Sequence, residues 1–139
     1  MTSTTHLGCP FCAPREEAVL AESALSLAVR DRYPVAPGHT LVIPRRHVGS
    51  IFDLMPAEWQ DLWDLVRQVR TIMMEESSGE WDANVGVNDG PAAGQTVDHA
   101  HVHIIPRTPG DVPDPRGGVR WVVPQRADYW SSPPEGEAT

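Results

Sequence analysis

The chain has 139 residues and a mass of 15.3 kDa, enough for one domain with a modest hydrophobic core. Its 11 basic residues are all arginine and stand against 19 acidic residues, which gives a formal charge of −8. The absence of lysine excludes a lysine Schiff base, a P-loop lysine and a nucleotidyl-lysine intermediate, and the negative charge argues against a nucleic-acid polymer as partner.

No apolar run approaches the roughly 20 residues of a membrane span, and the first residues lack the basic and apolar regions of a secretory signal. We therefore expect a cytoplasmic protein with no membrane partner. In that reducing compartment the pair Cys9 and Cys12, spaced as Cys-Pro-Phe-Cys, is more typical of a metal half-site or a redox pair than of a structural disulfide.

The first half of the chain predicts two strands and one helix. Residues 21–30 alternate imperfectly between apolar and polar side chains, a proline- and glycine-rich turn follows at 34–38, and 39–44 is a β-branched run that ends at proline. A helix is expected to begin near Pro56, because proline at the first helical position loses no hydrogen bond, and to end at 77–79.

Apolar side chains in this helix recur at steps of three and four residues, so they predict one buried stripe with the charged residues largely outside it. The stripe comprises Trp59, Leu62, Trp63, Val66, Val69 and Met73, and the charged residues are Glu58, Asp61, Asp64, Arg67 and Arg70. A strand at 82–88, a glycine-bounded loop at 89–94 and a strand at 95–106 follow. Antiparallel strands covered by one or two helices make an α+β domain.

Three histidines alternate with apolar residues in the last predicted strand: His99, His101 and His103. Residues two apart in a strand share a face and lie roughly 6.5 to 7 Å apart, so the three rings should line one surface. Packing alone explains such a row poorly, because each neutral ring needs two hydrogen-bond partners. The row fits either a catalytic zinc ion with an open water position or an imidazole nucleophile flanked by phosphate-binding neighbours.

The loop before the row favours an anionic ligand. Gln95 and Thr96 supply an amide and a hydroxyl directly before the histidines. Gly90 and Gly94 allow backbone N–H groups to come close to a ligand.

These motifs resemble the histidine triad (HIT) family of nucleotide hydrolases and transferases. The family signature, His-x-His-x-His followed by two apolar residues, is matched at 99–105. Residues 88–97 look like the fragile-histidine-triad branch, which cleaves dinucleoside polyphosphates, and 37–44 match the family's N-terminal element. The likeness extends from about residue 9 to residue 107.

The resemblance implies an α+β fold with an antiparallel five-stranded sheet, one long helix and one short helix. It also implies a homodimer that joins two such sheets. The whole chain, 1–139, would be a single HIT domain: a core at about 9–107, a segment at 108–130 for specificity or dimer contacts, and a tail at 131–139.

The resemblance further implies a nucleotide hydrolase. His101 would attack the α-phosphorus of a dinucleoside polyphosphate or a related nucleotide conjugate, and water would hydrolyse the covalent nucleotidyl-histidine. The carbonyl of His99 would accept the other ring N–H of His101 and fix its tautomer. His103 in the third triad position favours hydrolysis over nucleotide transfer.

The implied substrate-binding residues are Asp31, His39, Asn88, Gln95, Thr96 and His103. Asp31 matches the family's ribose-binding residue, although a turn carboxylate explains it too. His39, Gln95 and His103 would contact phosphate oxygens, and the Thr96 hydroxyl would lie near the leaving group. The purine phosphoramidase branch usually has serine in place of Thr96 and stays open as an alternative.

Some HIT proteins hold a structural zinc ion at positions that correspond here to Cys9, Cys12, His47 and His99. Such a Cys₂His₂ set is closed and tetrahedral, with no place for a catalytic water. The alternatives are unliganded thiols or a redox pair, which needs a preceding strand and a following helix N-terminus to lower the thiol pKa. Two further alternatives concern the whole protein: a metal-dependent hydrolase with the row as ligands, and a nucleotide-binding protein without activity.

The C-terminal segment is rich in aromatic residues. In HIT proteins this region can reach the partner subunit's active site, so Arg120 or Trp121 would help to select the leaving group. Alternatively, Trp121, Tyr129 and Trp130 cover the dimer seam, since aromatic residues are enriched at interfaces.

Overall fold

The computed structural model describes residues 7–78 and 80–132. The chain divides into two compact units after Arg107. The predicted frayed tails, 1–8 and 131–139, lie outside the described residues except for residues 7, 8, 131 and 132.

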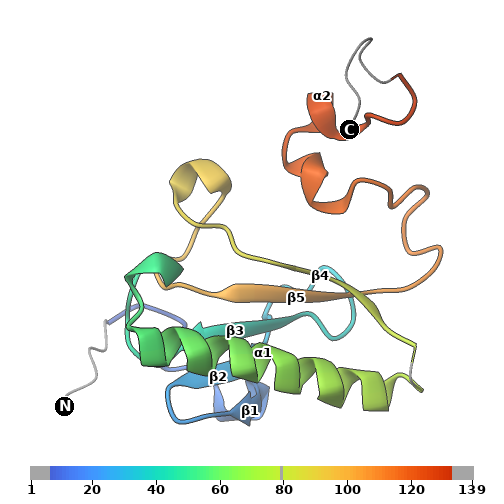
Figure 1. The fold of residues 1–139 in the computed structure, drawn as a ribbon. Coiled ribbons are helices and arrows are strands. Elements are labelled where there is room, and N and C mark those ends of the chain that lie inside the picture. Colours follow the sequence, from blue (N-terminus) through green and yellow to red (C-terminus); the bar gives the residue numbers. More distant parts are fainter. Residues whose placement is uncertain (1–6, 79, 133–139) are drawn as a thin grey trace. The chain divides into compact units, whose positions relative to one another are not determined.

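The first unit is a five-stranded sheet with one long helix (Figure 1). Its strands are β1 (Val19–Glu22), β2 (Ser26–Arg30), β3 (Thr40–Pro44), β4 (Asp82–Gly86) and β5 (Val102–Arg107). They lie in the order β1-β2-β3-β5-β4, and each neighbouring pair is antiparallel. The long helix is α1 (Pro56–Glu76), and the short helix α2 (Pro124–Ala127) belongs to the second unit. The predicted α+β class, five-stranded antiparallel sheet and pair of helices are confirmed.

The single strand predicted at 21–30 is wrong, because the chain turns back at 23–25 to form the β1-β2 hairpin. Ser23 N–H donates to Ser26 O at 3.0 Å and closes the turn. Asp61 of α1 accepts from the Ser23 hydroxyl at 2.5 Å and from Leu25 N–H at 3.2 Å. The carboxylate that stabilises this turn is distant in sequence, so local alternation could not reveal it.

The last strand begins later than predicted, at Val102 instead of residue 95. The preceding backbone bonds to loops: Ala100 N–H donates to Val48 O at 2.7 Å, and His99 N–H donates to Val97 O at 2.8 Å. His99 and His101 therefore lie just before β5, and His103 lies within it.

Helix α1 begins at Pro56 and ends at Glu76, as predicted, but its buried stripe is shifted. The buried apolar residues are Leu62, Leu65, Val69 and Met73. Trp59, expected in the stripe, is 38% exposed, whereas Glu58, expected outside it, is buried.

Glu58 is buried because three donors satisfy its carboxylate. Arg46 donates from Nε to Oε2 at 3.0 Å and from Nη2 to Oε1 at 2.9 Å. Met55 N–H donates to Oε1 at 2.8 Å and completes a capping interaction at the start of α1. The Arg46 hydrogen bonds lower the pKa of Glu58, which keeps the carboxylate charged.

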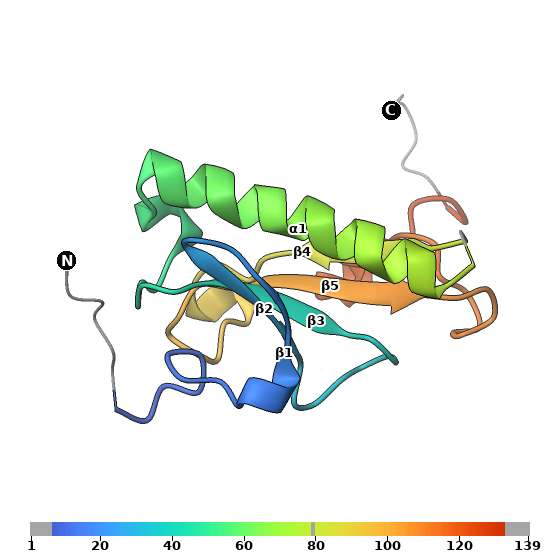
Figure 2. The same ribbon diagram turned by 90° about the horizontal axis from the view of Figure 1, so that it is seen from below.

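The two faces of the sheet differ in what covers them. Helix α1 covers one face (Figure 2), where Ala28, Val42, Val102 and Ile104 belong to its core cluster. Val29, Leu41 and Ile43 form a second cluster. Because side chains alternate between faces along a strand, this cluster lies on the face opposite α1. His103 is paired with Leu41 across β3 and β5, so its side chain shares that opposite face.

The second unit contains a short 3₁₀ helix at Gly118–Val122 and α2. Trp121 Nε1–H donates to Arg116 O at 2.8 Å. The guanidinium groups of Arg116 and Arg120 lie 4.8 Å and 4.6 Å from the ring centroids of Trp130 and Tyr129. The predicted roles of this segment in leaving-group choice or dimer contacts stay predictions. Within the described residues, no helix has the length and apolar character that crossing a membrane requires.

Candidate functional site

Three central strands bring the predicted site residues together on the sheet face opposite α1. Asp31 directly follows β2, His39 directly precedes β3, and His103 lies in β5. The backbone N–H of Asp31 donates to His39 O at 2.9 Å, which places the first two residues side by side. The His101 and His103 ring centroids lie 4.9 Å apart.

The contacts of His101 fix its tautomer. Its Nδ1 lies 2.8 Å from the carbonyl oxygen of His99, as the resemblance implies. A carbonyl oxygen only accepts hydrogen bonds, so Nδ1 carries the proton and Nε2 carries the lone pair. The ring is 7% exposed, and its Nε2 has the electron pair that an imidazole nucleophile needs.

A second chain of contacts fixes the protons of His39 and His103. Val35 N–H donates to His39 Nδ1 at 3.2 Å, so the proton of neutral His39 is on Nε2. That Nε2 lies 3.0 Å from His103 Nδ1 and 3.3 Å from Asp31 Oδ2. When His39 donates to His103, His103 carries its own proton on Nε2 and can donate it to a ligand.

Burial keeps these imidazoles neutral. It lowers the pKa of His39, against the opposing influence of the Asp31 carboxylate. Burial, with smaller contributions from His101 and His39, lowers the pKa of His103 from 6.5 to about 4. At neutral pH His103 is therefore an uncharged hydrogen-bond donor.

The depressed pKa of His103 predicts how stability depends on pH. Below pH 6.5 the unfolded chain binds a proton at His103, whereas the folded protein binds that proton only near pH 4. The contribution of His103 is complete above pH 6.5 and is lost as the pH falls from 6.5 toward about 4. Urea unfolding of metal-free protein should show a fall in unfolding free energy over this interval.

The variant His103→Gln should make that fall shallower. The slope should not vanish, because the pKa values of His39 and His99 are lowered by burial as well. An unchanged slope in the variant would show that His103 does not titrate in this way.

Among the described residues, two sets of side chains have the composition of a metal site, and they divide the histidine row. Asp31, His39 and His103 form one set. The Val35 N–H at His39 Nδ1 favours a proton on Nε2, the atom that would have to bind the metal. This set is therefore better suited to sharing protons than to binding a cation, and the row does not converge on one ion as metal-dependent hydrolysis requires.

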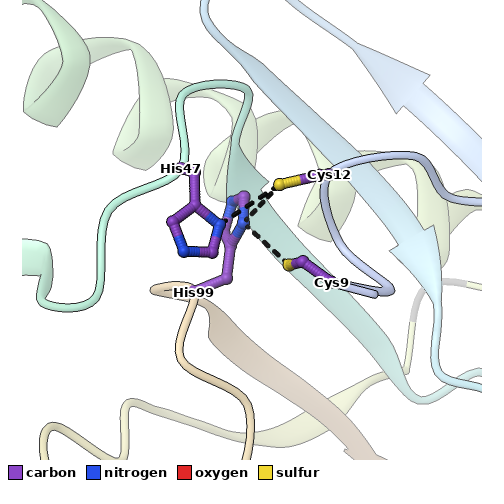
Figure 3. Close-up of side chains that lie close together, drawn as sticks. All are labelled: Cys9, Cys12, His47 and His99. Carbon is purple, nitrogen blue, oxygen red and sulfur yellow. Dashed lines mark hydrogen bonds between the residues drawn. The ribbon is translucent and has the colours of Figure 1, made fainter. Parts of the chain in front are cut away.

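The second set is Cys9, Cys12, His47 and His99 (Figure 3). Cys9 Sγ lies 3.5 Å and Cys12 Sγ lies 3.7 Å from His99 Nδ1, and Cys12 Sγ lies 3.2 Å from His47 Nδ1. The Nε2 of His99 donates to Pro44 O at 2.8 Å, which leaves the Nδ1 lone pair directed at the thiols. Two sulfurs and two imidazole nitrogens in this arrangement fit a tetrahedral zinc site.

The surroundings of the thiols do not match a redox motif. Both cysteines precede β1, and the next element after them is a three-residue 3₁₀ helix at Glu16–Ala18. Burial raises the pKa of the Cys9 thiol, whereas a reactive thiol needs a lowered pKa.

The other predicted substrate contacts lie around the glycine-bounded loop. Gln95 Oε1 accepts from Gly90 N–H at 2.8 Å, and Nε2 donates to Gly49 O at 2.8 Å and to Val97 O at 3.0 Å. Gln95 thus holds the loop in place, and binding phosphate would require it to release one of these carbonyls. Thr96 is exposed and Asn88 is half-buried.

Two features of the site were missed from the sequence. One is the Pro44 carbonyl, which orients His99, and only a three-dimensional contact reveals it. The other is Phe11, whose ring centroid lies 4.9 Å from that of His101. The sequence offered one signal for Phe11, which is its position between the two cysteines. If both thiols contact His99, the residue between them must lie near the histidine row.

Comparisons with known proteins identify the family of this chain. The HIT domain profile matches residues 14–110. The chain is 45% identical over 93 residues to the asymmetrical bis(5'-nucleosyl)-tetraphosphatase of Schizosaccharomyces pombe, which covers 67% of this chain and 50% of that protein. It is 42% identical over 88 residues to the adenosine 5'-monophosphoramidase hnt1 of the same species, covering 63% of this chain and 62% of that protein.

A solved structure described as a Zn-bound histidine triad family protein from Mycobacterium smegmatis aligns with a TM-score of 0.64 and 30% identity, over 83% of this chain and 90% of that one. The chain spans half the length of the tetraphosphatase. Since the profile matches well over half of this chain, the predicted family is confirmed. The chain belongs to the HIT domain family.

Proposed function

We propose that the protein is a nucleotide hydrolase that cleaves at the α-phosphate of a dinucleoside polyphosphate or a related nucleotide conjugate. The observation that carries this proposal is the hydrogen bond from His101 Nδ1 to the His99 carbonyl at 2.8 Å. It leaves the Nε2 lone pair for attack on phosphorus, and His103 supplies a neutral donor beside it.

In the first step a bond forms between His101 Nε2 and the α-phosphorus, and the bond from phosphorus to the leaving group breaks. His101 keeps its Nδ1 proton, so the ring of the nucleotidyl-histidine is cationic, and the His99 carbonyl stabilises that charge. The His103 Nε2–H donates to a phosphate oxygen. In the second step water attacks phosphorus and loses one proton to solvent, the mononucleotide is released, and the electron pair of the breaking P–N bond returns to Nε2. Neutral imidazole is a good leaving group here.

The remaining substrate contacts follow the residues around the site. Asp31 would bind the ribose, Thr96 would lie near the leaving group, and Asn88 and Gln95 would line the loop beside the phosphates. His39 would act on phosphate oxygens directly or through His103. A zinc ion held by Cys9, Cys12, His47 and His99 would stabilise the fold and supply no catalytic water, since the protein ligands fill its four positions.

The relatives support two substrate classes. The tetraphosphatase name favours a dinucleoside polyphosphate, and the name of hnt1 keeps a nucleoside phosphoramidate as the second candidate. Both share the α-phosphate chemistry and differ in the leaving group. A cytoplasmic location stays a prediction, which two thiols that lie beside imidazoles and form no disulfide support.

A panel of substrates tests this function. Dinucleoside triphosphate, dinucleoside tetraphosphate and nucleoside phosphoramidate are each assayed for mononucleotide release, with an acid quench of labelled substrate and mass spectrometry of the protein. The proposal expects a nucleotide adduct on His101. Turnover without any adduct would favour metal-dependent hydrolysis, and tight nucleotide binding without turnover would favour a non-catalytic binding protein.

We also propose that two copies pair through β4. Among the described residues β4 is an outer strand of the sheet, bonded only to β5, and its Val85 is 49% exposed. An open strand edge with an apolar side chain is a template for pairing with another strand. Pairing of two β4 strands would join two five-stranded sheets.

Light scattering in solution should therefore give a molar mass twice the 15.3 kDa of one chain. Val85→Lys should shift the protein toward the mass of a single chain, because a lysine on an outer strand opposes edge-to-edge pairing. Leu25→Lys is the matched control, since Leu25 is 37% exposed in the β1-β2 turn at the other end of the sheet. A monomeric wild-type protein would contradict the pairing.

A further inference from the structure

Phe11 lies between the two cysteines and packs against the histidine row. Its ring centroid is 4.9 Å from that of His101 at an interplanar angle of 72°, and 6.0 Å from that of His99 at 79°. Both are edge-to-face contacts. The same ring packs on the apolar cluster of Val29, Leu41 and Ile43.

We propose that Phe11 is a positioning residue for His101, and that the thiol loop at 9–12 holds it in place. This inference rests on the proposed function, because it concerns the orientation of the same nucleophile. It assigns the loop a second role beside metal binding: the loop closes an aromatic ring over the nucleophilic imidazole.

The packing contact matters because His101 has few other restraints. His101 lies directly before β5, its ring donates a hydrogen bond from Nδ1 to the His99 carbonyl, and the ring centroid of His103 lies 4.9 Å from its own. A single hydrogen bond lets a ring tilt about that contact, so the rings packed on either side of His101 decide its angle. An in-line attack requires accurate alignment of Nε2 with phosphorus, and a displacement of about 1 Å can lower a rate by about 10²-fold.

The position of Phe11 depends in turn on the thiols beside it. Residues 7–15 contain no helix or strand. Cys9 Sγ lies 3.5 Å from His99 Nδ1, and Cys12 Sγ lies 3.2 Å from His47 Nδ1. The loop is therefore anchored on both sides of Phe11. His99 links the thiols to His101, because its ring faces the thiols and its carbonyl oxygen accepts the hydrogen bond from His101 Nδ1. Release of the thiols should therefore free Phe11 and loosen His101.

The first experiment measures single-turnover formation of the nucleotide adduct in Phe11→Ala. We expect the rate to fall by about 10- to 100-fold, with KM and metal content unchanged. Phe11→Leu, which keeps most of the apolar bulk, should recover much of the rate. Phe52→Ala is the matched control, because Phe52 is 70% exposed and its ring contacts Trp59 of α1, the helix that covers the other face of the sheet.

A second readout does not depend on activity. Diethyl pyrocarbonate modifies accessible neutral imidazoles, and mass spectrometry locates the modified residue. In Phe11→Ala the modification of His101 should become faster than in the wild-type protein, in which this side chain is 7% exposed. The Phe52→Ala control should leave it unchanged.

A double-mutant cycle tests the link to the thiols. Cys12→Ser should slow adduct formation in the wild-type background and change it little in the Phe11→Ala background, because the ring that the loop carries is already absent. Cys9→Ser provides a second variant, and circular dichroism checks that each variant is folded. Rate losses that simply multiply would show that the loop does not act through Phe11.

Other outcomes would overturn the inference directly. A rise in KM alone for Phe11→Ala would make Phe11 a substrate contact, and unchanged modification of His101 would show that Phe11 does not cover that ring. Absence of an adduct in the wild-type protein would contradict the proposed function instead, and the modification rates would still decide whether Phe11 restrains His101.

Discussion

Replacing His101 with alanine is expected to reduce mononucleotide release by on the order of 10⁴-fold or more, the scale seen when a nucleophile is removed from an enzyme that uses covalent catalysis. The labelled adduct on the protein should disappear at the same time. Metal content and the far-ultraviolet circular dichroism spectrum should remain those of the wild type, because the His101 ring ligates no metal in the proposed site and supports no strand pairing.

The large effect follows from the proton positions around the row. His99 Nδ1 faces the thiols and His103 Nδ1 accepts from His39, so neither neighbour presents a free and oriented Nε2 lone pair in place of His101. His103→Gln is the matched control, since it removes a neighbouring imidazole and keeps the nucleophile. Its adduct should form more slowly and remain detectable. If His101→Ala kept more than about a tenth of the activity, the assignment of the nucleophile would be wrong.

The parts of the fold that were predicted correctly are those that local chemistry specifies. Proline at the start of α1 and a recurring apolar stripe define the helix, and β-branched residues before Pro44 define β3. The β1-β2 turn was missed because Asp61, which accepts its hydrogen bonds, lies in α1. The burial of Glu58 was missed for the same reason, since Arg46 reaches it from a loop.

The site likewise has features that the sequence reveals and features that only contacts between distant residues reveal. The histidine row and the thiol pair are visible as spacings, and family resemblance connects Cys9 and Cys12 to His47 and His99. Which nitrogen of each ring carries a proton depends on contacts such as Val35 N–H with His39, which no spacing reveals. Phe11 had no assigned role for a similar reason, because phenylalanine in a cysteine loop has no chemistry of its own until the fold brings His101 against it.

Removing the metal is expected to lower the stability of the first unit more than any single surface substitution. The proposed ligands come from three segments that are distant in sequence: the loop at 9–12, His47 after β3, and His99 before β5. A metal ion that binds the folded chain alone at about 1,000 times its dissociation constant adds about 4 kcal/mol to the unfolding free energy. For a chain of this length, this corresponds to a decrease of roughly 10 to 15 °C in the melting temperature after chelation.

Differential scanning calorimetry with and without a zinc chelator measures this shift, and elemental analysis gives the metal content. Cys12→Ser should begin with the lower melting temperature and respond little to the chelator. Glu75→Gln, an exposed change on α1, should behave as the wild type does. Re-addition of zinc should restore the wild-type melting temperature, since His99 is fully buried and its Nδ1 remains directed at the thiols by the Pro44 hydrogen bond. If the protein is purified without metal and zinc leaves its melting temperature unchanged, the thiols are unliganded. If its intact mass shows a Cys9–Cys12 disulfide, the redox alternative is favoured instead.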